Sequence, residues 1–272
     1  MHVKKESRIL KSPKEPRGER LESLERGLRV LELFGSGSEH ALAMIEVADR
    51  LGYTRAAAMR ILATLEDMGY VRLDGRIYTL TPKVLSLGYA YLVSLGFRAI
   101  AKPILDDLMR QTQETCSIGV LDDKDVVYVA RSEARRLIRI DLAVGSRLPA
   151  HVNSMGRVML AALPDRALDA FLRSVKLEKI TARSIVDKAE LKSRIVAIRE
   201  AGYCYIDGEV EDRIAGLAAP IRDRDGRVIA ALNMSLGFGR YTQEDIANKL
   251  LPMLFGNASK IEAILQHEVP IA

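Results

Sequence analysis

Two segments of this sequence hold polar residues at spacings that suit the binding of a small anion. In the first, HVNSMGRVML, Ser154, Met155 and Gly156 stand where an apolar helix is expected to begin. Free backbone N–H groups and the positive end of the helix dipole favour a carboxylate there, and Gly156 would allow it to approach closely. A helix capped by Ser154 without any ligand is the alternative interpretation.

The second segment is the expected strand VIAALNMSL, which carries two polar side chains in an apolar run. Asn233 and Ser235 are two residues apart, so both side chains point to the same face of the strand. Two such groups are costly to bury without partners. The sequence leaves two kinds of partner open, a polar ligand or the neighbouring main chain.

A third segment, GYTRAAAMRILATLEDMGY, predicts a helix from an N-cap at Thr54 to about Met68. Helical periodicity assigns Ala58, Ile61, Leu62, Leu65 and Met68 to its core side. The outer side carries Ala56, Met59, Arg60 and Ala63, with Arg55 at its edge. This outer side has no carboxylate before Glu66.

Such a surface suits the major groove of DNA. An arginine can donate two hydrogen bonds to guanine, and small alanines let a helix backbone approach the base edges. Arg72 and Arg76 lie on or beside a predicted hairpin turn, from which they could reach phosphates or the minor groove. The alternative is an Ala-rich exposed helix in a three-helix unit that binds protein and not DNA.

Catalytic and metal-binding patterns are absent from the sequence. His151 lies beside Asn153 and Ser154, but the four histidines lack metal-ligand spacing such as His-x-x-x-His. No Gly-x-Ser-x-Gly elbow, P-loop or Gly-x-Gly-x-x-Gly motif occurs. Cys116 and Cys204 stand in apolar contexts that are typical of core thiols. We therefore expect no catalytic residue, no metal and no cofactor, and a protein that is not an enzyme.

Composition indicates an ordinary globular protein that is long enough for two domains. The chain has 272 residues, 48% of them hydrophobic, and no apolar run long enough to span a membrane. The first residues lack the apolar block of a secretory signal, and two isolated cysteines suit a reducing, cytoplasmic setting. The net charge is only +5, and residues 20–83 carry equal numbers of basic and acidic side chains. A DNA site would therefore need a local basic face and a flexible basic arm, not a strongly basic domain.

The elements expected in the first third of the chain form a winged helix-turn-helix. Residues 1–20 read as a disordered basic tail, followed by helices at 21–34, 43–51 and 54–68. Leu21, Leu24, Leu28, Leu31 and Phe34 fall on one stripe of the first helix. Short strands at 70–73 and 77–80 flank the hairpin signal Asp74-Gly75. We assign 21–81 to this domain and 82–96 to a linker helix.

The pattern of expected helices and strands in residues 97–272 predicts a second domain of the α+β class. Helices are expected at 97–113, after Ser154, at 165–173, at 187–201 and at about 242–267. Strands are expected at 114–122, 125–132, 137–144, 203–207, 216–223 and 228–236. This pattern is typical of a ligand-binding or regulatory domain.

Five runs of the chain match the motifs of one known family, SLERGLRVLELF, LGYTRAAAMRILATLEDMGYVRLDGRIYTLTPKVLSLG, GSRLPAHVNSMGRVMLAAL, AGYCYIDGEVED and LAAPIRDRDGRVIAALNMSL. On these runs the chain resembles, from about residue 21 onward, the IclR family of bacterial transcription regulators. Within the family it looks most like the subgroup that controls catabolism of protocatechuate and 4-hydroxybenzoate. The resemblance implies a homodimer or dimer of dimers, a winged helix on double-stranded operator DNA, and a GAF-like domain that binds a small organic acid.

The resemblance also implies which residues face the effector. The matching positions are Asp207, Glu209, Asn233 and Ser235. To the expected effector site we add the residues around the predicted helix start, His151, Asn153, Ser154, Met155 and Gly156. The sequence departs from near relatives at two positions, with Arg213 in place of a glycine and Gly216 in place of a serine or cysteine. We expect a ligand-responsive regulator of a catabolic operon. The alternative is a small-molecule-sensing module that binds protein partners and not DNA.

Overall fold

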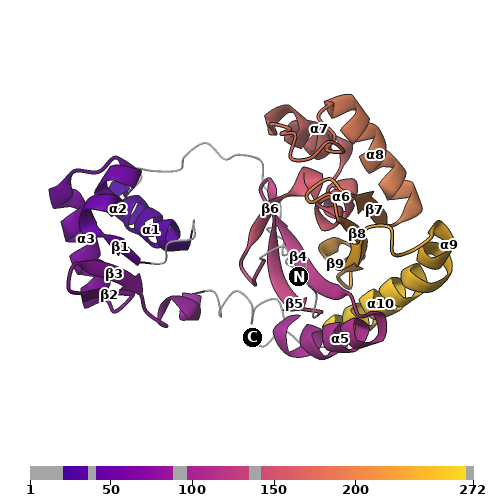
Figure 1. Cartoon of the computed structure of the whole chain (residues 1–272), viewed down its shortest axis with the longest axis horizontal. Coiled ribbons are helices and arrows are strands. Elements are labelled where there is room, and N and C mark those ends of the chain that lie inside the picture. The colour runs from indigo at the N-terminus through magenta and orange to yellow at the C-terminus, as the bar shows by residue number, and fades with distance from the viewer. Residues whose placement is uncertain (1–20, 36–40, 88–96, 135–141, 268–272) are drawn as a thin grey trace, which may run out of the picture. The chain divides into compact units, whose positions relative to one another are not determined.

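The computed structural model describes residues 21–35, 41–87, 97–134 and 142–267 of the chain. The chain divides into two compact units, Met1–Ala90 and Tyr91–Ala272 (Figure 1). The division falls within the predicted linker helix. Residues 84–87 are helical, but the rest of that helix and the predicted tail lie outside the described residues. In the described part of the chain, no helix is both long and apolar enough to cross a membrane.

The first unit has the predicted helix–helix–helix–hairpin order with one added strand. Its helices are α1 (Glu22–Gly35), α2 (Met44–Leu51) and α3 (Arg55–Asp67), and its strands are β1 (Ala41–Ala43), β2 (Val71–Asp74) and β3 (Ile77–Leu80). β1 was not predicted, and it pairs with β3 to give the sheet order β1-β3-β2. Asp74 pairs with Ile77, so the hairpin turn is Gly75-Arg76, one residue later than predicted. Gly75 adopts the left-handed φ of +63° that this turn needs.

Only part of the predicted apolar stripe on α1 is buried. The side chains that α1 buries are Val30 and Phe34, which pack against Val47, Leu62 and Tyr78 in the core of the first unit. Leu21, Leu24 and Leu28 remain 71%, 59% and 49% exposed. Periodicity found an apolar stripe correctly, but periodicity alone cannot say which surface covers a stripe.

The second unit is built on a six-stranded antiparallel sheet in the order β6-β5-β4-β9-β8-β7. Its strands are β4 (Thr115–Asp122), β5 (Asp125–Ser132), β6 (Arg147–Pro149), β7 (Cys204–Asp207), β8 (Ile214–Arg222) and β9 (Val228–Gly237). The short strand β6 was not predicted. Of the strand predicted at 137–144, residues 142–144 are not a strand and the others lie outside the described residues.

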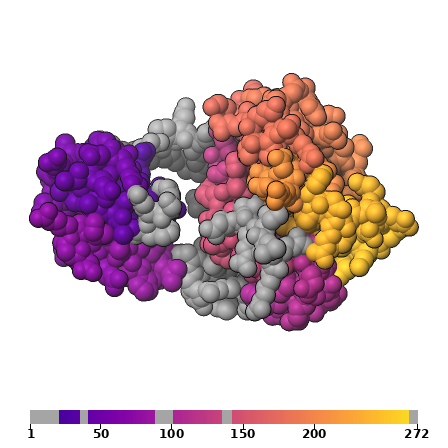
Figure 2. Space-filling view, viewed as in Figure 1, coloured from indigo at the N-terminus to yellow at the C-terminus, as the bar shows by residue number. Residues whose placement is uncertain are grey.

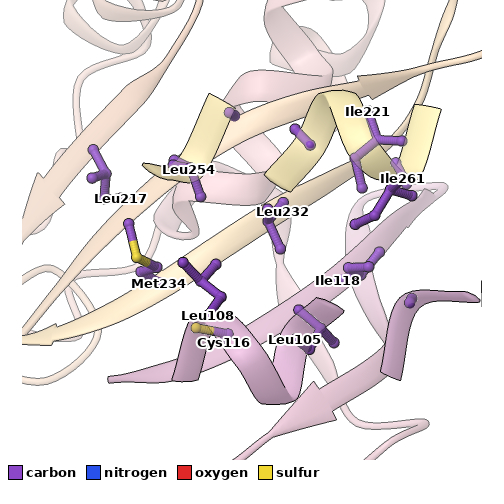
Figure 3. Close-up of a cluster of buried hydrophobic side chains, with 14 of the residues drawn as sticks. Leu105, Leu108, Cys116, Ile118, Leu217, Ile221, Leu232, Met234, Leu254 and Ile261 are labelled. Atoms are coloured by element: carbon purple, nitrogen blue, oxygen red, sulfur yellow. The ribbon is translucent and has the colours of Figure 1, made fainter. Parts of the chain in front are cut away.

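Helices cover both faces of this sheet. On one face α5 (Phe97–Thr112) and α10 (Leu251–His267) lie side by side (Figures 1 and 2). Their leucines and isoleucines pack on alternate residues of the central strands, such as Ile118, Leu232 and Met234 (Figure 3). The final helix is not uniform, because a π-helical turn, Ile246–Leu250, separates the short α9 (Gln243–Asp245) from α10.

The other face of the sheet carries α6 (Ser154–Ala161), α7 (Asp165–Ser174) and α8 (Lys188–Ala201). α6 is the central helix of this layer, and all eight of its residues are buried. We call the sheet surface beneath it the α6 face. Any polar group that this surface carries must find a partner inside the protein.

A buried ion pair fixes α6 in place. Arg157 donates from Nε to the His151 carbonyl oxygen at 2.7 Å and from a terminal nitrogen to Glu209 at 2.7 Å. Its other terminal nitrogen bonds the second oxygen of Glu209. Hydroxyls of Thr181 and Ser184 in turn donate to the main chain at Gly208 and Glu209. One guanidinium therefore ties α6 to the loop that follows β7.

We predict that Arg157→Met destabilises the protein by ~3–5 kcal/mol, because it leaves the Glu209 carboxylate buried without its counter-ion. The double variant Arg157→Met/Glu209→Leu should recover much of this loss, since it removes both charges. Urea unfolding followed by circular dichroism measures both effects. As a matched control, Asp169→Asn breaks an exposed pair with Lys192 and should change little. A double variant as unstable as the single one would contradict this explanation.

Candidate DNA-binding face and effector site

The outer side of α3 has the predicted exposure. Ala57, Ala58, Leu62 and Leu65 are buried, while Arg55, Ala56, Met59, Arg60 and Ala63 face solvent. Met68, predicted for the core, is exposed, and Ile61 is half-buried. The predicted small, carboxylate-poor surface is therefore free to meet a partner, and its contacts with DNA stay a prediction.

The ends of this surface are set by local hydrogen bonds. The Thr54 hydroxyl accepts from the Ala57 N–H at 3.2 Å, which confirms the predicted N-cap. On the hairpin, Arg72 Nε donates to the Thr79 hydroxyl at 3.2 Å, which holds the arginine across the two strands. Arg76 lies in the turn itself and is exposed.

The start of α6 is capped by Asn153 and not by Ser154. Asn153 Oδ1 accepts from the N–H groups of Met155 and Gly156, at 2.9 and 3.4 Å. A Cβ on Gly156 would lie 2.2 Å from the Ala150 carbonyl oxygen, so this glycine serves the close packing of the turn before α6. The N–H groups expected to be free for an anion are thus occupied by Asn153 in this structure, and anion binding at this helix start stays a prediction.

Because Asn153 provides the cap, the Ser154 hydroxyl is free to bond to β9, the strand that carries Asn233 and Ser235. Asn233 Nδ2 donates to the Ser154 hydroxyl at 2.9 Å, and Ser235 donates to Asn233 Oδ1 at 3.1 Å. The predicted common face of Asn233 and Ser235 is therefore confirmed, and it is the α6 face. The Asn233 amide also lies 3.4 Å from the Leu217 carbonyl oxygen. The main-chain partner that the sequence left open is therefore present, and the polar ligand stays a prediction.

Gly216 makes the contact between α6 and β9 possible. A Cβ at this position would lie 2.7 Å from the Ser154 hydroxyl oxygen and 3.5 Å from the Asn233 amide nitrogen. The hydroxyl of Ser154 thus takes space that a side chain at 216 would need. Arg213, the other departure from the near relatives, is exposed, and its carbonyl oxygen accepts from the Phe238 N–H at 2.9 Å.

The two predicted acidic residues are not grouped with Asn233. Asp207 pairs with Ala215, whose side chain belongs to the core beneath α5 and α10, so the two-residue period of β7 turns Asp207 away from the α6 face. Glu209 is bound by Arg157 in the buried pair described above. Both residues line a groove of about 640 Å³ beside α8.

His151 and the two cysteines have features of a protein interior, not of a reaction site. Burial, and then the charge of Arg157, lower the pKa of His151 below its ordinary value, so its imidazole is neutral at pH 7. Neither ring nitrogen has a hydrogen-bond partner among the described residues. Burial raises the pKa of Cys116 and of Cys204 to about 12, which keeps both thiols protonated. The described residues contain no cluster of potential metal ligands.

Three polar residues on the α6 face were not predicted from the sequence, Ser117, Tyr128 and Arg131. Asn153 Nδ2 donates to the Tyr128 hydroxyl at 3.0 Å, and Arg131 donates to the Ser117 hydroxyl at 3.3 Å. Strict alternation in TCSIGVLD could have assigned Ser117 to the face of Gly119. On β5 a bulge between the Tyr128 and Ala130 pairs shifts the alternation, and this hides Arg131 from pattern analysis.

Together these side chains form one continuous set, which we call the polar band. It comprises Ser117, Tyr128, Arg131, Asn153, Ser154, Asn233 and Ser235. Its members come from three strands and from the start of α6, and they provide hydroxyls, amides and one guanidinium but no carboxylate. Burial raises the pKa of Tyr128, although the bond from Asn153 opposes this, so the phenol keeps its proton. Such a donor-rich surface suits an anion with further polar groups.

Comparisons with known proteins agree with the architecture of both units. The model of the IclR helix-turn-helix domain matches residues 23–75, and that of the bacterial transcriptional regulator IclR C-terminal domain matches residues 89–263. The Pca regulon regulatory protein of Pseudomonas putida is 41% identical over 85% of this chain and 80% of its own length. The p-hydroxybenzoate hydroxylase transcriptional activator of Acinetobacter baylyi is 33% identical over 89% of this chain and 91% of its own.

Solved structures show the same fold. A transcriptional regulator from Rhodococcus sp. RHA1 has a TM-score of 0.80 and 41% identity, covering 90% of this chain and 98% of that one. A double mutant of the inducer binding domain of the Acinetobacter PobR transcription factor, in complex with 3-hydroxybenzoic acid, has a TM-score of 0.57 and 31% identity. It covers 60% of this chain and 96% of its own. The chain belongs to the IclR family of bacterial transcriptional regulators, DNA-binding proteins that are not enzymes.

Proposed function

We propose that this protein regulates an operon for the catabolism of aromatic compounds, and that a small aromatic carboxylic acid bound at the polar band is its effector. The observation that carries the proposal is the polar band itself. It buries donors from β4, β5, β9 and the start of α6 on one apolar sheet face. A fold that needed only stability would more often place apolar side chains there.

The relatives support an aromatic acid as the ligand class. The regulators of the Pca regulon and of p-hydroxybenzoate hydroxylase are similar over most of the chain. The PobR inducer binding domain, at 31% identity, is complexed with an aromatic hydroxy acid. A ring with a carboxylate and a hydroxyl would find donors in the polar band and apolar contacts in neighbouring residues such as Met155 and Ala231.

Binding at Ser154, Asn233 or Ser235 would exchange hydrogen bonds, because these three side chains already bond to one another. The Ser154–Asn233 bond joins α6 to the sheet, so a ligand that takes either partner would change how α6 is held. A ligand biases a regulator only through its different affinities for two arrangements. The position of α6 is the arrangement that we propose to respond.

The outer side of α3, with Arg72 and Arg76 of the hairpin, is our proposed contact with double-stranded operator DNA. A single winged helix covers one half-site, and a symmetric operator calls for a homodimer. The exposed stripe Leu21, Leu24 and Leu28 on α1 suits contact with a second copy, since such apolar patches mark interaction surfaces. The stripe continues into a groove that also includes Leu31, Ile61 and Met68. The relatives are DNA-binding regulators, and they give no support to the alternative of a sensor without DNA binding.

Arg55→Ala and Arg60→Ala should each weaken binding to the operator by ~1–3 kcal/mol, if each arginine contacts a base with two hydrogen bonds. Fluorescence anisotropy with DNA from the region upstream of the protein's own gene, and with random DNA of equal length, measures this. Arg29→Ala is the matched control, because Arg29 is an exposed arginine of the first unit that pairs with Glu25 on α1. Equal losses on both DNAs would show contacts to phosphate alone.

The double variant Leu24→Glu/Leu28→Glu should convert the dimer to monomers, because two carboxylates would have to be buried in the proposed contact. Analytical ultracentrifugation without DNA tests this. Ile45→Glu places a carboxylate at a similarly exposed apolar position on α2 and should leave the dimer intact. If the double variant sediments like the unaltered protein, the stripe does not form the dimer contact.

Titration calorimetry with protocatechuate, 4-hydroxybenzoate and β-ketoadipate tests the ligand class. We expect at least one aromatic acid to bind reversibly, without turnover, and to change operator affinity. By linkage, operator DNA should then change affinity for that acid by the same factor. If neither protocatechuate nor 4-hydroxybenzoate binds, the proposed effector class is wrong, whether or not β-ketoadipate binds.

A further inference from the structure

The register of the sheet brings one cation into line with the polar residues of the α6 face. Arg131 on β5 pairs with Ser117 on β4, and Ser117 pairs with Asn233 on β9. The three side chains therefore form one row across three strands, on the same face. The next row holds Thr115, Ser235 and Gly216. Among the described strand residues in these two rows, Arg131 carries a positive charge and the others are uncharged.

The guanidinium of Arg131 is largely enclosed and leans along this row. The side chain is 11% exposed, and its terminal nitrogen lies 3.3 Å from the Ser117 hydroxyl, which places it over β4 and toward Asn233. Its carbon lies 5.9 Å from the centre of the Tyr128 ring. The second terminal nitrogen has no hydrogen-bond partner among the described residues.

The ionic partner of Arg131 is weakly held. Its Nε donates to the Glu133 carboxylate at 3.0 Å, but Glu133 is 49% exposed. Water screens such a pair, so its contribution to stability is small. A carboxylate that entered the polar band could therefore displace Glu133 at little cost.

Other arginines of the second unit are less suited to this role. Arg157 is neutralised by the buried Glu209, and its three donor nitrogens are all engaged. Arg183 stacks on the Phe238 ring at 4.3 Å and is exposed. Arg213 is exposed as well. Of these four arginines, Arg131 is the one that combines an enclosed guanidinium, a contact with the polar band and an exposed counter-ion.

We propose that Arg131 binds the carboxylate of the effector, with Ser117 orienting the guanidinium, while Asn233, Ser235 and Ser154 take the polar group at the other end of the ligand. The two ends of the row are two strand spacings apart, ~10 Å, which suits a single ring with its hydrogen bonds at each end. The proposal rests on the function proposed above. It adds that the site selects a carboxylate over a neutral group of the same shape.

Titration calorimetry of the full-length protein with 4-hydroxybenzoate and with its neutral amide, 4-hydroxybenzamide, tests this selection. The unaltered protein should prefer the acid. Arg131→Gln should weaken binding of the acid by about 10- to 100-fold, as expected for losing a charged hydrogen-bond donor, and should leave the amide affinity within a few-fold. Arg131→Lys keeps the charge but loses the planar guanidinium, so its affinity for the acid should lie between those of the unaltered protein and of Arg131→Gln.

Glu133→Gln is the matched control beside Arg131. It removes the resting partner of Arg131, so the acid should bind as tightly as before or more tightly. Operator affinity without ligand and the circular dichroism spectrum show whether each variant is folded. If Arg131→Gln does not fold, the comparison of Arg131→Lys with the unaltered protein decides.

The outcomes separate this inference from the proposed function. If the unaltered protein binds the acid and Arg131→Gln or the folded Arg131→Lys keeps its full preference over the amide, the role of Arg131 is wrong and the effector class stands. If the unaltered protein binds neither this acid nor the other aromatic acid of the preceding titration, the proposed effector class fails and the inference fails with it.

Discussion

The hydrogen bonds that hold the start of α6 against the sheet determine the arrangement of the rest of the second unit. α6 is wholly buried, so each polar group at its start needs a protein partner, and an unpaired one would cost ~1–3 kcal/mol. Asn153 satisfies two helix N–H groups with its oxygen and reaches Tyr128 with its nitrogen. This leaves the Ser154 hydroxyl directed at β9 and not at its own helix.

The same constraint explains why the polar side chains of the proposed effector site bond to one another instead of standing free for a ligand. Ser154, Asn233 and Ser235 satisfy one another, and the Arg157–Glu209 pair holds the neighbouring turn. A ligand then competes with existing bonds, which limits its net affinity but raises its selectivity. Only a molecule that replaces each bond it breaks binds well. A regulator needs such selectivity more than tight binding.

The elements of both units could largely be predicted from sequence, because long periodic runs and glycine-ended helices specify them locally. The outer side of α3 and the common face of Asn233 and Ser235 followed from the helical and strand periods alone.

Three features could not be predicted from these periods. The apolar stripe of α1 was predicted, but periodicity does not reveal that Phe34 is buried while Leu21, Leu24 and Leu28 are exposed. The sequence allows a ligand to approach Gly156 closely, but only the fold shows that the Ala150 carbonyl oxygen takes the space where a Cβ at this position would lie. The third feature is the composition of the site. Asp207 was grouped with Asn233 on the strength of the family resemblance, but its pairing with Ala215 turns it to the opposite face. Arg131 was not predicted for the α6 face because the bulge on β5 shifts the alternation of side chains along this strand. Both depend on how strands pair across long sequence separations, which local patterns do not contain.

A crystal structure of the full-length protein with a bound aromatic acid tests the proposed effector site most directly. We expect the carboxylate against Arg131 and Ser117, the ring beneath the start of α6, and the distal polar group at Asn233 or Ser235. An acid bound instead in the groove beside α8, against Arg183 or Arg194, with the Ser154–Asn233 bond intact, would contradict this assignment.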